Sequence, residues 1–292
     1  MNKSETSVVN LEHLREWIGK SEAHADQVTL TPMAALAATL DRDDPFPRAG
    51  DLLPPLWHWL YFLPVHRQSE LGPDGHAKRG GFIPPVPLPR RMFAGGRFQF
   101  LKPLRGGESI SRVSRIADVT CKTGRSGPLV FVLVRHEISN QDGLALVEEH
   151  DIVYRDHEPR GEKASNRSPQ SAPTDAAWTR EVFADAVMLF RYSALIFNAH
   201  RIHYDLRYCK EVEGYPGLIV HGPLIATLLA DLARRNLPQA HMTGFSFRAV
   251  RPLFDTRPFR VSGKPDATGK SVNLWATDPD GWLAMSATAT LA

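Results

Sequence analysis

The spacing of hydrophobic residues predicts one long amphipathic helix in each half of the chain. In residues 217–235, GLIVHGPLIATLLADLARR, leucine and isoleucine recur every three or four positions and predict a helix from about Pro223. In residues 30–40, LTPMAALAATL, Thr31 is the predicted N-cap and Pro32 the first helical residue. Both segments are apolar enough to form the centre of a core.

Four runs rich in β-branched residues follow each helix and predict antiparallel strands. They cover residues 97–104, 109–124, 128–140 and 144–156, then 245–254, 257–265, 270–278 and 281–291. The two halves also share a local phrase, FQFLKPL at 98–104 and FSFRAVRPLF at 245–254. We therefore expect a diverged structural repeat of α+β class, in which each sheet wraps round a central helix. Side by side, two such units could form one continuous sheet with a site between them.

Two irregular segments interrupt this pattern. Residues 72–96, GPDGHAKRGGFIPPVPLPRRMFAGG, contain five prolines and many glycines, which excludes regular helix or central strand. Their apolar content favours a functional loop over disorder. Residues 155–178 are rich in Ser, Pro and charge and lack periodicity. They predict a first domain at 1–157, a linker at 158–177 and a second domain at 178–292.

Composition narrows the classes of function. The 292 residues carry a formal net charge of only +3, and the longest Lys/Arg runs are too short to indicate a nucleic-acid partner. Cys121 and Cys209 lie far apart and form no CxxC motif, which fits a reduced, cytoplasmic setting without disulfides. The sequence shows no signal-peptide core or membrane span, and it leaves a homodimer open.

The densest candidate chemistry lies in residues 198–205, where six of eight side chains can form hydrogen bonds. Asn198 and His203 do not share a face of a helix, so they converge only if the chain turns between them. The alternative is a polar loop with a capping Asn and two surface histidines. Further on, His221-Gly222 opens the predicted helix, where a glycine N–H and the helix N-terminus could form an oxyanion hole. An ordinary helix start is the alternative there.

These motifs resemble the MaoC-like hot-dog family. Its hydratase-2 pattern is Gly-Asp-x-Asn-Pro-x-His, followed by a His-Gly pair at the start of the central helix; here FNAHRIH occupies 197–203 and HG occupies 221–222. The segment FNAHRIHYD is similar to the sequences of a two-domain subgroup, as are LPPLWHWLYFLP and GGFIPPVPLPRRMFAGG in the first half. That subgroup contains 3-hydroxyacyl-thioester dehydratases and the mesaconyl-C4-CoA and itaconyl-CoA hydratases. The resemblance implies a double hot-dog fold and an acyl-CoA substrate.

The resemblance also implies roles for individual residues. His203 matches the catalytic histidine, and Gly222 the glycine whose N–H polarises the thioester carbonyl. Asn198 stands where the family has a catalytic aspartate, and an amide cannot exchange a proton. We therefore expect Asn198 to hold the water while His203 transfers the proton, assisted by His200, Tyr192 or Asp205. The predicted substrate-binding residues are Arg201, His200, Tyr192, His221, Arg90 and Arg91. No metal or cofactor is implied, because coenzyme A is part of the substrate.

Several residues keep two interpretations. Arg201 could bind a substrate carboxylate or form a salt bridge with Asp205. Arg90 and Arg91, at the end of the Pro-rich loop, could meet coenzyme A phosphates, although solvent exposure is the favoured interpretation. A zinc site is disfavoured; its candidate ligands would be His200, His203, His221 and Cys209. Core packing is expected of Trp57, His58 and Trp59, whereas Asp74 and His76 receive no role.

Four functions remain open in the sequence. The first is hydration of an unsaturated C5 dicarboxylic acyl-CoA, itaconyl-CoA or mesaconyl-C4-CoA, to citramalyl-CoA, as in itaconate degradation. The second is dehydration of a 3-hydroxyacyl thioester in fatty acid synthesis. Thioester hydrolysis is less favoured because Asn198 replaces the carboxylate, and non-catalytic acyl-CoA binding does not explain the dense motif. The first half lacks a FNAHRIH-like string, so we expect it to supply the tunnel wall and the second half the catalysis.

Overall fold

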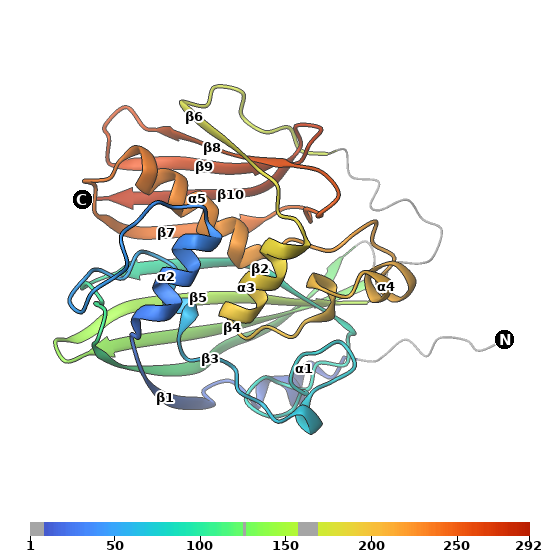
Figure 1. The fold of residues 1–292 in the computed structure, drawn as a ribbon. Coiled ribbons are helices and arrows are strands. Elements are labelled where there is room, and N and C mark those ends of the chain that lie inside the picture. The colour runs from blue at the N-terminus through green and yellow to red at the C-terminus, as the bar shows by residue number, and fades with distance from the viewer. Residues whose placement is uncertain (1–8, 125–126, 157–168) are drawn as a thin grey trace.

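A computed structural model of the chain describes residues 9–124, 127–156 and 169–292. Its strands form one ten-stranded antiparallel sheet in the order β1-β3-β4-β5-β2-β7-β10-β9-β8-β6 (Figure 1). The strands of the first half are β1 Ser21–Gln27, β2 Arg90–Phe100, β3 Ser109–Gly124, β4 Gly127–Asn140 and β5 Gly143–Arg155. Those of the second half are β6 Trp178–Val182, β7 Met242–Ala249, β8 Phe259–Pro265, β9 Ser271–Thr277 and β10 Leu283–Leu291.

The strand order reads the same from both edges, since β1, β3, β4, β5 and β2 correspond to β6, β8, β9, β10 and β7. The repeat expected from the sequence is therefore present, and its two sheets are joined along β2 and β7. At this seam Phe98 pairs with Phe245, so the shared phrases lie directly opposite each other. The rings of Phe98 and Phe247 also stack, with centroids 6.2 Å apart. The repeated Phe-x-Phe pattern thus builds the centre of the sheet.

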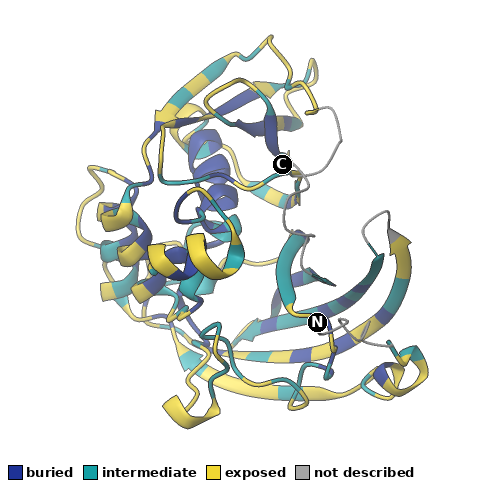
Figure 2. Ribbon diagram, turned by 90° about the vertical axis from the view of Figure 1, so that its right-hand side faces the viewer, coloured by how far each residue is buried: buried dark blue, intermediate teal, exposed yellow. Residues whose placement is uncertain are grey.

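Helices α2, α3 and α5 lie over one face of the sheet, with α5 at the centre of the second half, whereas α4 packs on neighbouring short helices (Figures 1 and 2). The helix bounds are α1 Leu11–Arg15, α2 Leu30–Thr39, α3 Ala186–Leu195, α4 Leu206–Tyr208 and α5 Gly222–Asn236. The core face of α5 is packed so completely that Leu224, Leu228 and Leu229 are fully buried. Each such leucine contributes roughly 1.5–3 kcal/mol by leaving water. The predicted start near Pro223 is confirmed within one residue.

Two local predictions were wrong. Helix α2 begins at Leu30 with Thr29 as N-cap, two residues before the predicted cap. Proline is tolerated throughout the first turn, where amide donors lack helical acceptors, so Pro32 marked the turn and not its first residue. The second error is in residues 72–96, whose end from Arg90 onward forms β2, a central strand. Glycine suits position 96 of this strand, because the Cβ of any other residue would lie only 3.0 Å from the Phe247 ring.

The predicted linker at 158–177 falls mostly on residues 157–168, which lie outside the described residues. The part that follows attaches to the second half, where Ser171 forms a β-bridge with Trp282. The division into domains 1–157 and 178–292 stays a prediction. Across it, Arg42 Nη1 of the first half lies 2.6 Å from Asp231 Oδ1 of α5.

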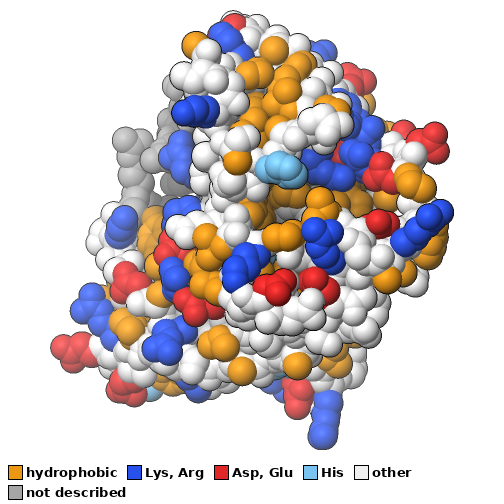
Figure 3. All heavy atoms as spheres, turned by 90° about the vertical axis from the view of Figure 1, so that its left-hand side faces the viewer, with side chains coloured by type: hydrophobic (Ala, Val, Ile, Leu, Met, Phe, Trp, Pro, Cys, Tyr) orange, Lys and Arg blue, Asp and Glu red, His pale blue; other side chains and the backbone are white. Residues whose placement is uncertain are grey.

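Two observations bear on partners. Within the described ranges, no helix is both long and apolar enough to cross a bilayer. On the face drawn in Figure 3, Lys and Arg side chains are interspersed with Asp, Glu and hydrophobic side chains. This face therefore carries charges of both signs, as the small net charge of the sequence suggests.

Candidate functional site

The chain turns sharply between α3 and the motif at 198–205. Helix α3 is capped by Asp185, whose Oδ1 accepts a hydrogen bond from Met188 N at 2.9 Å. After it, Phe197 adopts a positive φ of 50°. Asn198 Oδ1 then accepts a hydrogen bond from His200 N at 2.9 Å, closing an Asx turn. This turn directs the 3-10 helix Arg201–His203 inward. The side chain of Asn198 thus has a capping role, as the polar-loop alternative proposed.

The two histidines of the motif are buried, contrary to the surface location in that alternative. His203 is 7% exposed, and its Nδ1 lies 2.8 Å from the carbonyl oxygen of Ile219. Because a carbonyl only accepts, Nδ1 carries the proton and the neutral ring has its lone pair on Nε2. Burial lowers the pKa of His203 to about 4, against the opposing effect of the Ile219 hydrogen bond. At neutral pH the ring is therefore an uncharged base.

His221 and Gly222 complete the start of α5 beside this base. The rings of His203 and His221 stack with centroids 3.6 Å apart and planes inclined by 17°. His221 Nε2 lies 2.8 Å from Ser193 Oγ, and burial lowers the pKa of His221 well below its ordinary value. A Cβ on Gly222 would lie 3.9 Å from Phe93, an ordinary contact, so packing does not demand glycine there. The first-turn N–H groups of α5 offer donors to a developing anion.

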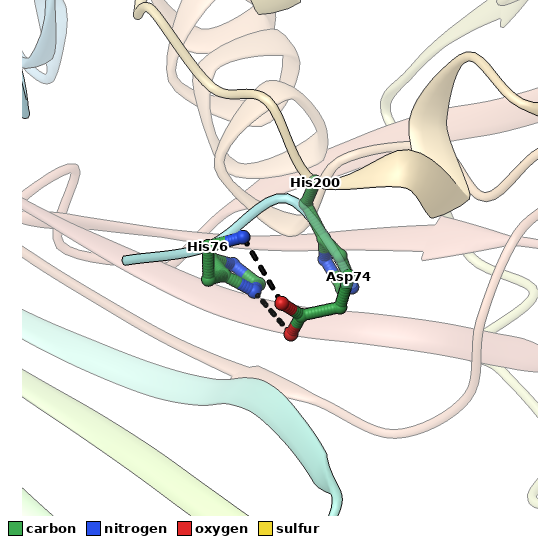
Figure 4. Close-up of side chains that lie close together, drawn as sticks. All are labelled: Asp74, His76 and His200. Carbon is green, nitrogen blue, oxygen red and sulfur yellow. Dashed lines mark hydrogen bonds and ion pairs between the residues drawn. The ribbon is translucent and has the colours of Figure 1, made fainter. Parts of the chain in front are cut away.

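Asp74 and His76, which the sequence left without a role, lie on a loop of the first half that reaches this site (Figure 4). His76 Nδ1 lies 3.0 Å from Asp74 Oδ2, and the rings of His76 and His200 are 4.0 Å apart. Arg201 N donates to Asp74 O at 2.9 Å, which ties the loop to the motif. Gly75 is obligatory, because a Cβ there would lie 1.8 Å from the Ala199 carbonyl oxygen and its φ is +91°. The local signal was the Asp-Gly-His string in a Gly-rich loop.

The electrostatics of this loop favour an ionised carboxylate beside neutral rings. Burial opposes ionisation of Asp74, but its hydrogen bonds and charge interactions with His76 together outweigh burial and hold its pKa below the usual range. Burial lowers the pKa of His76, although Asp74 opposes this. Burial is also the main cause of the lowered pKa of His200, and the neighbouring histidines add to it. Asp74, His76 and His200 have ligand atoms within 4.8 Å of one another and could hold a metal ion.

The predicted alternative zinc set does not assemble in this way. Cys209 Sγ donates to the carbonyl of Ile202 at 3.0 Å, and burial raises the pKa of the thiol to about 11. A thiol held in this form is a poor metal ligand, since zinc binds thiolate. In the described ranges, the four side chains of this set do not bring three ligand atoms within 4.8 Å of one another.

The candidate arginines differ in their partners. Arg201 binds Asp205 Oδ2 through Nη2 at 2.8 Å and Nε at 3.1 Å, which is the salt-bridge alternative. Its Nη1 donates to Pro73 O at 3.1 Å. Arg90 is 9% exposed by side chain and forms an ion pair with Glu213 at 3.3 Å, so the prediction that it is solvated was wrong. The ion pair and the Tyr215 ring, 5.2 Å from the guanidinium carbon, bury it.

The remaining predicted residues lie in or near the core. Tyr192 is 1% exposed with its ring 5.1 Å from that of His221, and burial raises the pKa of its phenol. Trp57 lies in the core as expected. Its neighbours have a more specific partner, since His58 Nε2 and Trp59 Nε1 lie 3.0 and 3.1 Å from the buried carboxylate of Glu148.

Comparison with known proteins shows the family to which the chain belongs. Residues 56–255, more than half of the chain, match the model of hydroxyacyl-thioester dehydratase type 2. The chain belongs to this family. It is 50% identical over 275 residues to mesaconyl-C(4)-CoA hydratase of Chloroflexus aurantiacus, covering 94% of this chain and 96% of the relative. It is 29% identical over 249 residues to the mitochondrial hydroxyacyl-thioester dehydratase type 2 of Schizosaccharomyces pombe, covering 76% and 80%.

Solved structures share the fold of this family member. A MaoC-like dehydratase has a TM-score of 0.70 at 13% identity, with 94% of this chain and 98% of that chain covered. A Mycobacterium tuberculosis protein with a double hot-dog fold has a TM-score of 0.56 at 14% identity, with 94% and 96% covered. At such identities the likeness concerns the fold alone. The predicted double hot-dog and the MaoC-like resemblance are both confirmed.

Proposed function

We propose that the chain is a hydro-lyase that adds water to an unsaturated C5 dicarboxylic acyl-CoA. The substrate is mesaconyl-C4-CoA or itaconyl-CoA and the product citramalyl-CoA, as in itaconate degradation. The activity named for the half-identical Chloroflexus relative supports this choice of substrate. The observation that carries the chemistry is His203, a buried base with Nδ1 tied to Ile219 O, beside the N-terminus of α5.

The proposed addition needs a base, an acid and an oxyanion donor. In mesaconyl-C4-CoA, whose double bond is conjugated with the thioester, His203 Nε2 takes a proton from water as the water oxygen bonds to the β-carbon. The π electrons move to the thioester oxygen, where Gly222 N–H and the α5 N-terminus stabilise the enolate. The imidazolium, stabilised by Ile219 O, then returns its proton to the α-carbon, so atoms and charges balance. Asn198 stays the proposed water-holding residue, through its amide group.

Dehydration of a 3-hydroxyacyl thioester is the second candidate, because it is the same chemistry in reverse. The name of the Schizosaccharomyces pombe relative supports it. In either direction the residues act without a cofactor, and coenzyme A belongs to the substrate. A cytoplasmic location and a homodimer remain predictions; the former is supported by Cys121 and Cys209, which are both free thiols.

A direct assay tests the proposal. Purified protein is incubated with mesaconyl-C4-CoA, itaconyl-CoA, crotonyl-CoA and a long-chain 2-enoyl-CoA, and gain of one water is followed by mass spectrometry. His203→Gln should lower kcat on the preferred ester by about 10²- to 10⁴-fold, the usual contribution of a proton-transfer group. His66→Gln, a variant of a ring that is 44% exposed, is the control and should match wild type. Release of coenzyme A without hydration, or no reaction at all, would overturn the proposal.

A further inference from the structure

Arg91 faces the candidate site from the seam of the sheet. Residues two apart in a strand point to the same side, so Arg91 and Phe93 of β2 share a face. That face is the inner one, because Phe93 lies 3.9 Å from where a Cβ of Gly222 would be. Opposite Arg91 in β5 is Tyr154, which is fully buried. The guanidinium therefore extends from the floor of the site and not from the outer surface.

Its charge acts on rings from both halves of the chain. Burial is the main cause of the lowered pKa of His76, His200 and His150, and the positive charge of Arg91 contributes to all three. Solvent and salt screen such effects beyond about 10 Å. Arg91 consequently lies close to His76 and His200 of the proposed active site.

Arg91 also differs from its neighbours in lacking a counter-ion. Arg90 pairs with Glu213, Arg201 pairs with Asp205, and Arg79 donates to the backbone carbonyls of the Pro-rich loop. Over the described part of the chain, no carboxylate forms an ion pair or hydrogen bond with Arg91. The residue is only half-buried, so its side chain is partly open to solvent water in the free protein. A ligand that displaces this water must supply an anion, because a desolvated charge without a partner is costly.

We propose that Arg91 binds the free carboxylate of the dicarboxylic acyl group and so determines substrate specificity. This inference rests on the proposed function. In a mesaconyl-C4 thioester the free carboxylate is bonded to the β-carbon, the atom that receives the hydroxyl group. Its counter-ion must therefore lie within the candidate site; Arg91 acts on His76 and His200, and the His200 ring packs against that of His203 with centroids 5.5 Å apart. The phosphates of coenzyme A are separated from this carbon by the whole pantetheine arm. Arg201, the residue predicted for this role, is already engaged by Asp205 and Pro73.

The geometry of guanidinium explains the choice of residue. Arginine can bind both oxygens of a carboxylate at once, which fixes the plane of the carboxylate and hence the orientation of the adjacent double bond. The β-carbon of a monocarboxylic ester such as crotonyl-CoA carries a methyl group and a hydrogen atom, and no carboxylate. It would leave Arg91 without an anion. The residue would then favour the dicarboxylic ester in binding as well as in turnover.

The test compares Arg91→Gln with wild type on mesaconyl-C4-CoA and crotonyl-CoA. The variant should lose on the order of 10²- to 10³-fold in kcat/KM for the dicarboxylic ester, as for a truncated charge pair, with little change for crotonyl-CoA. Arg97→Gln is the matched control, since Arg97 is on the same strand but pairs with Glu149 and Asp151 on the outer face. Equal losses on both esters, or no loss on either, would overturn the assignment.

Equilibrium binding separates this inference from the proposed function. The dissociation constants of both thioesters are measured by calorimetry for wild type and for Arg91→Gln. Weaker binding of mesaconyl-C4-CoA alone supports the assignment even if wild type hydrates neither ester, a result that would overturn only the proposed function. Identical dissociation constants in both proteins would contradict the role of Arg91. Circular dichroism and thermal unfolding confirm that each variant is folded.

Discussion

The rings of His76 and His200 lie 4.0 Å apart, although the residues belong to opposite halves of the chain. His200 in turn packs edge-on against His203, with ring centroids 5.5 Å apart. A continuous set of imidazoles thus runs from the Gly-rich loop of the first half to the proposed base. The first half therefore contributes titratable groups to the candidate site, besides the tunnel wall that the sequence predicted for it.

Replacing Asp74 by Asn should impair turnover more than substrate binding. The carboxylate fixes the orientation of His76 through Nδ1, and an amide would remove the charge from that 3.0 Å hydrogen bond. A hydrogen bond to a charged group is worth about 1.5–3 kcal/mol, so kcat should fall roughly 10- to 150-fold. Steady-state kinetics of Asp74→Asn and of Asp280→Asn, an exposed control, give the comparison. If kcat is unchanged in Asp74→Asn, the loop only supports the fold.

Gly222→Ala tests the oxyanion donor with little disturbance of the core. The added Cβ would make an ordinary 3.9 Å contact with Phe93, and Ala suits a helix better than Gly. Thermal stability should therefore be equal or slightly higher. In contrast, the methyl group would hinder the approach of the thioester oxygen to the N–H, so kcat/KM should fall by about 10²-fold or more. Wild-type kinetics in this variant would show that the thioester binds elsewhere.

The parts that were predictable rest on local patterns. The Phe98 and Phe245 phrases predicted the repeat because equivalent strands share the same alternation in the sequence, whereas their pairing with each other at the seam is shown only by the structure. Likewise, His203 and Gly222 lie within short strings, one in a turn and one at a helix start. Asp74 and His76 could not be assigned, because their meeting with His200 depends on how a loop of one half crosses the other.

The arginines show the same limit. Arg90 and Arg91 are adjacent in the sequence and identical in type, so no local pattern separates them. The alternation of β2 places them on opposite sides, and Glu213 then engages Arg90 alone. Only the tertiary structure shows which guanidinium lacks a counter-ion.

Acid should destabilise the protein through His203. Its pKa is about 4 in the folded chain, chiefly because of burial, and about 6.5 when the chain is unfolded. Between these values the unfolded chain binds the additional proton, so stability is complete above pH 6.5 and is lost as the pH falls toward 4. The loss from this ring is on the order of 3 kcal/mol. Urea unfolding at several pH values should show that His203→Gln takes up about one proton fewer than wild type when it unfolds. An identical pH slope in both proteins would contradict the shift.

Asp231 should be the most sensitive polar position outside the site. Its carboxylate is fully buried in α5, 2.6 Å from both Arg42 Nη1 and Arg235 Nε, while Arg180 and Arg234 lie within 3.8 Å. Asp231→Asn keeps the shape but leaves these guanidinium groups without their shared counter-ion. Breaking a buried pair in this way costs roughly 3–5 kcal/mol, whereas Asp280→Asn, in an exposed pair with Arg257, should cost less than about 1 kcal/mol.

The same variant separates stability from catalysis. Asp231 lies nine residues after Gly222 in α5, roughly 13 Å along the helix, so the proposed oxyanion donor should be undisturbed. Urea unfolding of Asp231→Asn should show the loss of stability, and kcat/KM per folded molecule should match wild type. Because Arg42 belongs to the first half and Asp231 to the second, a combined loss of stability and turnover would mean that this ion pair also sets the approach of the Asp74 loop to His200. An unchanged unfolding midpoint would instead show that the arginines find water once the carboxylate is gone.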